Sequence, residues 1–150
     1  CGAPFTVASY LIEGGPTKHY NKTRGLMVSE PHVWHALMEK LATMSIEYLS
    51  LQAESGANAL QIFESWVGAV NRNQYDIFIF PHMERIISTV KARFPTVPLA
   101  MNGVGTDHLV TSWAKLPLDV VALDWRSSEE TQPLVALLKR CKVILTRRTY

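Results

Sequence analysis

Cysteine is scarce in this chain, and long apolar runs are absent from it. The two cysteines, Cys1 and Cys141, do not form the spacing of a disulfide framework or of a metal-binding pair. This scarcity favours a reducing compartment, so we expect a cytoplasmic location. No apolar run approaches the ~20 residues that span a bilayer, so no membrane partner is expected.

An excess of charge of one sign is also missing. With 15 Lys and Arg against 13 Asp and Glu, the formal net charge is +2. This charge is too small to indicate binding to nucleic acid or to a membrane surface. The basic residues Lys18, His19, Lys22 and Arg24 are interpreted as a solvated surface in preference to an anion site.

The chain does have the length and composition of one globular domain. It has 150 residues, of which 47% are hydrophobic and 19% are charged, and this suffices for a compact core without an internal boundary. The first residues include no initiator Met and no basic signal segment, so the chain opens as though cut from a longer protein. Residues 1–150 are therefore predicted to be a fragment of a single domain.

A long amphipathic helix is predicted in the first half of the chain. Ser29 and Pro31 indicate its start, and Gly56 indicates its end. Between them, an apolar stripe recurs at three- and four-residue steps and is expected to face the core: Val33, Trp34, Leu37, Leu41, Met44, Tyr48 and Leu51. His32 and His35, in the first turns, are interpreted as surface histidines.

Short strands alternate with helices along the rest of the sequence. Strands are predicted at 58–63, 97–101, 119–123 and 143–145. Helices are predicted over 7–12, 71–80, 81–94 and 107–115, and over a segment that Ser127 or Ser128 caps. This alternation predicts an α/β fold with a parallel sheet. We expect a partial TIM (β/α)8 barrel, roughly its central half, because a complete barrel takes ~250 residues. An open doubly wound sheet is the alternative.

Polar residues gather at the predicted carboxyl ends of the strands, where α/β proteins bind ligands. They are Thr6, Ser9 and Tyr10, then Glu64 and Ser65, then Asn102, Thr106 and Asp107, and finally Asp124 and Arg126. Ser65 is not surrounded by the GxSxG pattern of a hydrolase. The glycine-rich loop at 102–106 has no P-loop lysine.

The remaining polar residues do not predict a specific chemistry. Asp124 and Arg126 form either a structural ion pair or a ligand contact. His82 and His108 have no further ligand at a suitable spacing, so no metal site is predicted. From the residues alone, the chain is a barrel-like domain with a polar rim and an unknown substrate.

Three motifs resemble a known family. Residues 2–6 (GAPFT) with 9–15 (SYLIEGG) resemble the signature GAP-[FW]-T…Y-[ML]-[VI]-EGG of uroporphyrinogen decarboxylases. Residues 56–65 (GANALQIFES) resemble that family's GA-x-A-[VL]-Q-[LIV]-F-[DE]-S stretch, and 120–126 (VVALDWR) resemble its VVG-[LV]-DW landmark. The motifs follow the family's order, so the resemblance spans nearly all of the chain.

The resemblance implies a cytoplasmic, cofactor-free (β/α)8 enzyme of haem biosynthesis that forms a homodimer. Such enzymes remove the carboxyl groups from the four acetate arms of uroporphyrinogen III and give coproporphyrinogen III. The family's catalytic and substrate-binding residues carry over to Tyr10, which matches the motif tyrosine, and to Ser65, which follows the acidic residue. Phe63 is expected to wall the substrate cavity.

Other functional residues of the family lie outside the sequence. An Arg-rich motif, an Asp that holds the pyrrole N–H groups, and a His have no match here. The family continues its last strand with LQGNLDP, whereas this chain reads 145–150 (LTRRTY). The isolated fragment is therefore expected to be inactive.

Two alternatives remain open. Corrinoid-dependent methyltransferases of the same superfamily carry a His-x-Cys zinc motif at the strand predicted over 97–101, but residues 102–104 (NGV) contain neither ligand. A non-catalytic fragment or pseudoenzyme is the other alternative.

Overall fold

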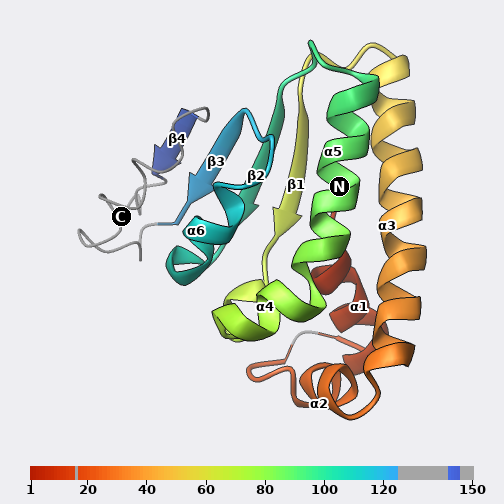
Figure 1. Cartoon of the computed structure of the whole chain (residues 1–150), viewed down its shortest axis with the longest axis vertical. Coiled ribbons are helices and arrows are strands. Elements are labelled where there is room, and N and C mark those ends of the chain that lie inside the picture. Colours follow the sequence, from red (N-terminus) through yellow and green to blue (C-terminus); the bar gives the residue numbers. More distant parts are fainter. Residues whose placement is uncertain (16, 125–141, 146–150) are drawn as a thin grey trace.

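The computed structural model describes residues 1–15, 17–124 and 142–145 (Figure 1). Four parallel strands form one sheet in sequence order: β1 (Leu60–Glu64), β2 (Leu99–Gly103), β3 (Val120–Leu123) and β4 (Lys142–Leu145). The predicted α/β class is confirmed, and the ends of the strands lie within two residues of their predicted positions. The helix predicted after Ser127 lies outside the described residues.

The first residues extend this sheet on the other side of β1. Gly2 forms a parallel bridge with Phe63. The backbone N–H of Ala3 donates to the carbonyl of Phe63 at 2.9 Å, and the N–H of Phe63 donates to the carbonyl of Cys1 at 2.8 Å. Helix α1 (Pro4–Glu13) then starts three residues before the predicted helix, because the fixed φ of Pro4 suits a first helical turn.

The two faces of the sheet have different surroundings. Along β1, Leu60, Ile62 and Glu64 are buried, whereas Gln61 and Phe63 are exposed. On this side of the sheet, α1 and α3 (Pro31–Glu54) contact β1, and α5 (Phe80–Arg93) packs side by side with α3 (Figure 1). The helices of the described chain therefore cover one face of β1 and leave the other open.

Helix α3 turns a different face to the core from the one predicted. Trp34 and Leu41 are buried as expected, but Met44, Tyr48 and Leu51 are about half exposed. The buried stripe lies beside the predicted one and contains Trp34, Met38, Leu41, Ala42, Ser45, Ile46 and Leu49. Both stripes have helical spacing, and the small side chains of Ala42 and Ser45 let neighbouring helices approach.

The predicted cap of α3 is wrong, whereas its predicted end is confirmed. Ser29 is the last residue of α2 (Asn21–Ser29), a helix that the sequence did not predict, and Glu30 precedes α3 without a side-chain cap. Gly56 has φ +92°, a left-handed conformation that stops the helix.

Short helices follow β1 and β2. After β1 come the 3-10 turn η1 (Val67–Ala69) and α4 (Arg72–Phe78). Asn71 caps α4 by accepting a hydrogen bond from the N–H of Gln74 at 2.9 Å. After β2 come η2 (Asp107–Leu109) and α6 (Val110–Trp113), in place of the single helix predicted over 107–115.

The interpretation of His35 as a surface residue is wrong. His35 Nδ1 lies 2.9 Å from Nε2 of His82, which is buried between α3 and α5. Burial is the main cause that lowers the pKa of His82, followed by the neighbouring His35, while Glu39 opposes this effect. His32 is exposed, as expected.

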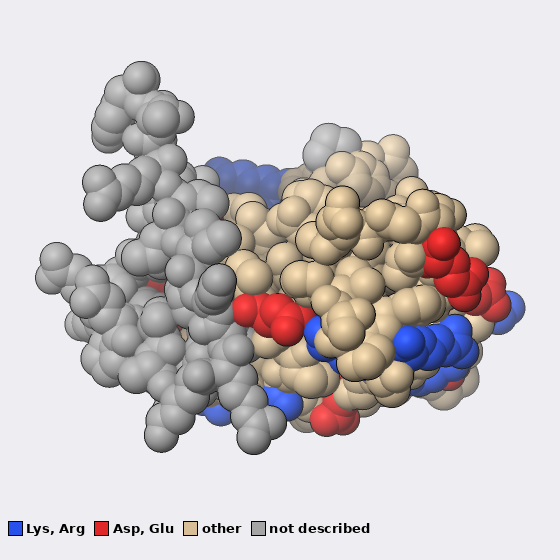
Figure 2. Space-filling view, turned by 90° about the horizontal axis from the view of Figure 1, so that it is seen from above, with Lys and Arg blue, Asp and Glu red and all other residues tan. Residues whose placement is uncertain are grey.

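Charged side chains are dispersed over the amino ends of the strands. Figure 2, seen from above the view of Figure 1, shows acidic and basic residues in small groups on a mostly uncharged surface. This face is opposite to the end toward which the strand arrows point in Figure 1. No helix in the described part of the chain is long and apolar enough to cross a membrane.

Candidate active site

The carboxyl ends of the strands lie level with one another. Glu64 pairs with Gly103, and Asn102 pairs with Ala122. Because Gly2 bridges to Phe63, α1 also begins at this end of the sheet, near α2 and α4 (Figure 1). Segments that are far apart in sequence thus meet at one end.

Phe63 and Ser65 belong to the open side of β1. Phe63 is 45% exposed and pairs with Asn102 of β2, which is half-buried. Ser65 follows the strand with the same parity and is also half-buried. In sequence, both residues have the opposite parity to Leu60 and Ile62, and this agrees with the observed alternation of burial along β1.

Tyr10 reaches this end of the sheet through an aromatic stack. Its ring centroid lies 4.0 Å from that of Trp66, and the ring planes are inclined at 40°. Trp66 also contacts Tyr20, at 5.1 Å. Because Trp66 follows Ser65 directly, the stack brings Tyr10 toward Ser65, while the Tyr10 side chain stays 51% exposed. An exposed phenol beside a serine hydroxyl can donate hydrogen bonds to a bound carboxylate or ring.

Tyr20 forms the other end of this aromatic stack, on Trp66. It has a left-handed backbone, with φ 50°, and its N–H donates to Thr17 Oγ1 at 2.9 Å. Burial raises the pKa of Tyr20, and the neighbouring Tyr10 and Glu13 raise it further. The phenol of Tyr20 therefore stays neutral at physiological pH.

Glu64 was predicted to be one of the polar residues at the strand ends, but no role in the site was assigned to it. Its side chain is fully buried, and its Oε1 accepts a hydrogen bond from Thr6 Oγ1 at 3.2 Å. Burial raises the pKa of Glu64 to about 8, although hydrogen bonds from Thr6 oppose this shift. The burial of Glu64 could have been predicted from the sequence. In a strand, residue 64 lies on the same face as Leu60 and Ile62, so its acidic side chain points toward the core.

The glycine-rich loop after β2 packs against the loop after β1. A Cβ atom at Gly68 would lie 2.4 Å from the carbonyl oxygen of Val104, and Gly105 has φ +64°. Thr106 is buried at the foot of this loop. These glycines therefore serve close packing between two loops at the candidate site.

The other predicted polar residues are partly outside this arrangement. Asp124 is buried, but Arg126 lies outside the described residues, so their predicted ion pair is untested. His108 contacts the carbonyl of Val70 through Nε2 at 2.8 Å. Across residues 1–15, 17–124 and 142–145, no group of three or more His, Cys, Asp or Glu residues could hold a metal ion.

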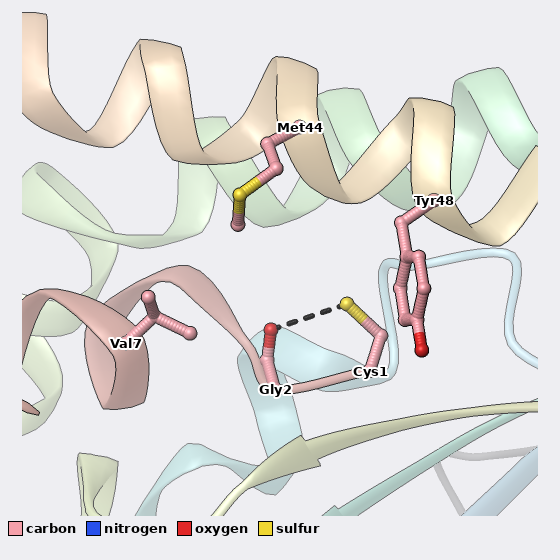
Figure 3. Close-up of a pocket in the computed structure, with 5 residues that line it drawn as sticks. All are labelled: Cys1, Gly2, Val7, Met44 and Tyr48. Atoms are coloured by element: carbon pink, nitrogen blue, oxygen red, sulfur yellow. Dashed lines mark hydrogen bonds between the residues drawn. The ribbon is translucent and has the colours of Figure 1, made fainter.

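A separate apolar pocket lies on the side of α3. It has a volume of about 300 Å³ and is lined by Cys1, Gly2, Val7, Met44 and Tyr48. Figure 3 shows Met44 and Tyr48 projecting from α3 toward the first residues of the chain. None of these lining residues is a candidate site residue, and none carries a cationic side chain for a carboxylate.

Comparisons with known proteins agree with the motifs. The sequence model of the family described as Uroporphyrinogen decarboxylase (URO-D) matches residues 1–143. The chain is 57% identical over 127 residues to the uroporphyrinogen decarboxylase of Geobacillus sp. (strain WCH70), covering 85% of this chain and 36% of that protein. It is 51% identical over 140 residues to the enzyme of that name from Listeria monocytogenes serotype 4a, covering 91% of this chain and 40% of that protein.

The chain thus spans well under half the length of the curated relatives that it matches. A solved structure of an intracellular xylanase from Thermoanaerobacterium saccharolyticum superposes with a TM-score of 0.46 and 13% identity, over 72% of this chain and 43% of that one. This likeness is too weak to bear on the fold. Because the family model covers residues 1–143, the chain belongs to the uroporphyrinogen decarboxylase family.

Proposed function

We propose that this chain forms part of the substrate cavity of a uroporphyrinogen decarboxylase, a carboxy-lyase of haem biosynthesis. The enzyme would convert uroporphyrinogen III to coproporphyrinogen III by removing the carboxyl groups of four acetate arms. The observation that carries the proposal is the meeting of two family motifs, because the Tyr10 and Ser65 segments come together through Trp66 at the carboxyl end of the sheet.

In the proposed reaction, the substrate supplies the electron acceptor and the protein supplies the groups that bind and orient the substrate. The pyrrole next to an acetate arm is protonated, and the cationic ring accepts the electron pair as carbon dioxide leaves. Tyr10 and Ser65 are proposed to hydrogen-bond a substrate carboxylate or ring, and Phe63 is proposed to form an apolar wall beside it. Preorganised donors of this kind lower the barrier because they need no reorientation during the reaction.

The (β/α)8 barrel is the proposed architecture of the whole domain. Two features of the described residues support it. Strands β1 to β4 follow sequence order, with the first residues of the chain on the far side of β1. Helices cover one face of β1, whereas a doubly wound sheet has helices on both faces and a switch in strand order. An inward face bearing Phe63 and Asn102 is what a barrel requires.

The remaining properties rest on the family alone. A cytoplasmic homodimer that needs no cofactor is proposed for the full-length protein that contains this chain. Sedimentation of that protein and its turnover of uroporphyrinogen III after treatment with a chelator test these proposals. Absence of turnover in the untreated protein would favour the non-catalytic alternative.

Tyr10→Phe is expected to lower kcat/KM of the full-length protein roughly 10- to 150-fold, because a hydrogen bond to a charged group contributes ~1.5–3 kcal/mol. Coproporphyrinogen formation is the measurement. Tyr48→Phe is the matched control, since Tyr48 is similarly exposed but lies on α3. Equal rates for the two variants would show that the Tyr10 hydroxyl does not contact the substrate.

Ser65→Ala is expected to raise KM or lower kcat while the melting temperature changes little. The competing role for this hydroxyl is to stabilise the turn after β1, and its loss would then lower stability by ~0.5–2 kcal/mol. Thermal unfolding and steady-state kinetics of the same variant separate the two roles. A variant that melts earlier but turns over normally would contradict the substrate contact.

A further inference from the structure

Glu64 is a fully buried carboxyl group next to Ser65, and the proposed reaction does not use it. Its Oε1 accepts a hydrogen bond from the hydroxyl of Thr6 at 3.2 Å, and the backbone N–H of Thr6 also donates to this carboxyl. Its Oε2 has no hydrogen-bond partner among the described residues. A buried carboxyl is costly, so its position between β1 and α1 requires an explanation.

Helix α1 has no side-chain cap of its own. Its N-cap residue is Ala3, whose side chain has no acceptor, and Pro4 occupies the first turn. The free N–H groups at a helix start usually bond to a Ser, Thr, Asp or Asn at the N-cap. Here the carboxyl of Glu64, from a distant strand, faces the first turn at Thr6. The end of β1 is thereby tied to the start of α1.

Thr6 and Tyr10 lie on the same side of α1. They are four residues apart, so they occupy successive turns of one helix face. Thr6 is buried against Glu64, whereas Tyr10 extends over Trp66. The hydrogen bond from Thr6 to Glu64 therefore fixes how α1 is rotated about its axis and how far it is displaced along that axis. Both determine where Tyr10 contacts the loop after β1.

We propose that Glu64 is a positioning residue of the candidate site, which holds Thr6 and thereby keeps Tyr10 stacked on Trp66 beside Ser65. The kinetic part of this inference rests on the proposed decarboxylase function, whereas the placement of Tyr10 does not. Phe63 of β1 and Ser65, which follows it, are thus proposed to face the substrate, while Glu64 between them aligns α1.

The charge state of Glu64 makes this positioning dependent on pH. With a pKa of about 8, the carboxyl is neutral at pH 7 and ionises above pH 8. From α4, Tyr75 is the ionisable group that faces it, and burial followed by Glu64 raises the pKa of that phenol. No Lys, Arg or His of the described residues offsets the desolvation of Glu64. The hydrogen bonds from Thr6 favour the ionised form, but burial outweighs them. Ionisation is therefore expected to draw the carboxylate toward water and away from α1.

Variants of the full-length protein test this role. Glu64→Leu and Thr6→Val remove the contact from either side, and each is expected to lower kcat roughly 10- to 100-fold, because small misplacements of reacting groups have effects of that size. Their double variant should lose no more than the stronger single one. Glu64→Gln should recover most of this turnover at pH 7 and lack the alkaline loss of activity that the wild type shows near pH 8.

A spectroscopic measurement tests the placement without any substrate. Tyrosines are replaced by 3-fluorotyrosine, and the ¹⁹F signal of Tyr10 is assigned with Tyr10→Phe. At pH 7, the signal is expected to shift in Glu64→Leu and Thr6→Val relative to the wild type. It should stay in place in Ser112→Ala, the control that removes the buried hydroxyl bonded to Asp76 away from α1.

The two proposals fail in different ways. If the wild-type protein does not turn over uroporphyrinogen, the proposed function is wrong, and the ¹⁹F signal alone decides the role of Glu64. If the wild type is active but folded Glu64→Leu keeps its kcat and its Tyr10 signal, the positioning role is wrong. An alkaline loss of activity that persists unchanged in Glu64→Gln would also overturn it.

Discussion

Trp34→Ala is expected to lower the free energy of unfolding by about 3–5 kcal/mol, the usual cost of removing a buried large aromatic side chain. The indole of Trp34 is fully buried in α3. Its Nε1 donates to the carbonyl of Phe78 at the end of α4 at 2.9 Å. Its ring also meets the edge of Phe5 in α1, at 6.0 Å between centroids. Three helices therefore lose a shared contact, and the Phe78 carbonyl loses its donor.

Denaturant unfolding of the full-length protein measures this loss. Trp34→Phe is the matched control, because it keeps a ring against Phe5 but removes the N–H group, at an expected cost of about 1–3 kcal/mol. The alanine variant should be clearly the less stable of the two. Similar midpoints for both variants would show that the ring contributes little beyond its hydrogen bond.

Gly68→Ala is expected to destabilise the protein by about 1–3 kcal/mol or more. The added methyl group would overlap backbone atoms, which cannot move aside as a side chain can. The new Cβ would lie 2.4 Å from the carbonyl oxygen of Val104 and 2.8 Å from that of Gly105. Both obstacles are backbone atoms, so the two loops must separate. Since one of these loops carries Ser65 and Trp66, turnover should fall as well.

Gly25→Ala provides the control for Gly68. Gly25 lies exposed inside α2, and a Cβ there meets no atom within 4 Å. Alanine favours helix over glycine by about 0.5–1 kcal/mol, so this variant should gain stability. Thermal unfolding of both variants is the measurement. A Gly68→Ala protein as stable as Gly25→Ala would contradict the close approach of the two loops.

Local patterns predicted the elements well because these patterns reflect burial. The short apolar segment around Ile62 predicted β1, and the alternation along it separates the buried residues from Phe63. Gly56 ended α3 because few other residues adopt its backbone conformation. The start of α5 was predicted within one residue, because the fixed φ of Pro81 suits the first turn of a helix.

Features that depend on packing between distant segments were harder to predict from the sequence. Helix α3 has apolar residues on neighbouring faces, so spacing alone could not show that Met44 is exposed and Met38 is buried. The stack of Tyr10 on Trp66 joins residues from distant segments, and no periodicity predicts such a contact. His35 was misinterpreted because its partner, His82, lies on another helix.

The central position of β1 has a consequence for how this region folds. One neighbour, the strand end at residues 1–3, is separated from β1 by α1, α2 and α3, and the other, β2, is separated from it by α4 and α5. No turn can bring these strands together locally, so each pairing must close a long loop before it gains any contact. We expect the helices to form in microseconds and the sheet to form much later. Closure of the chain around β1 should then limit the folding rate.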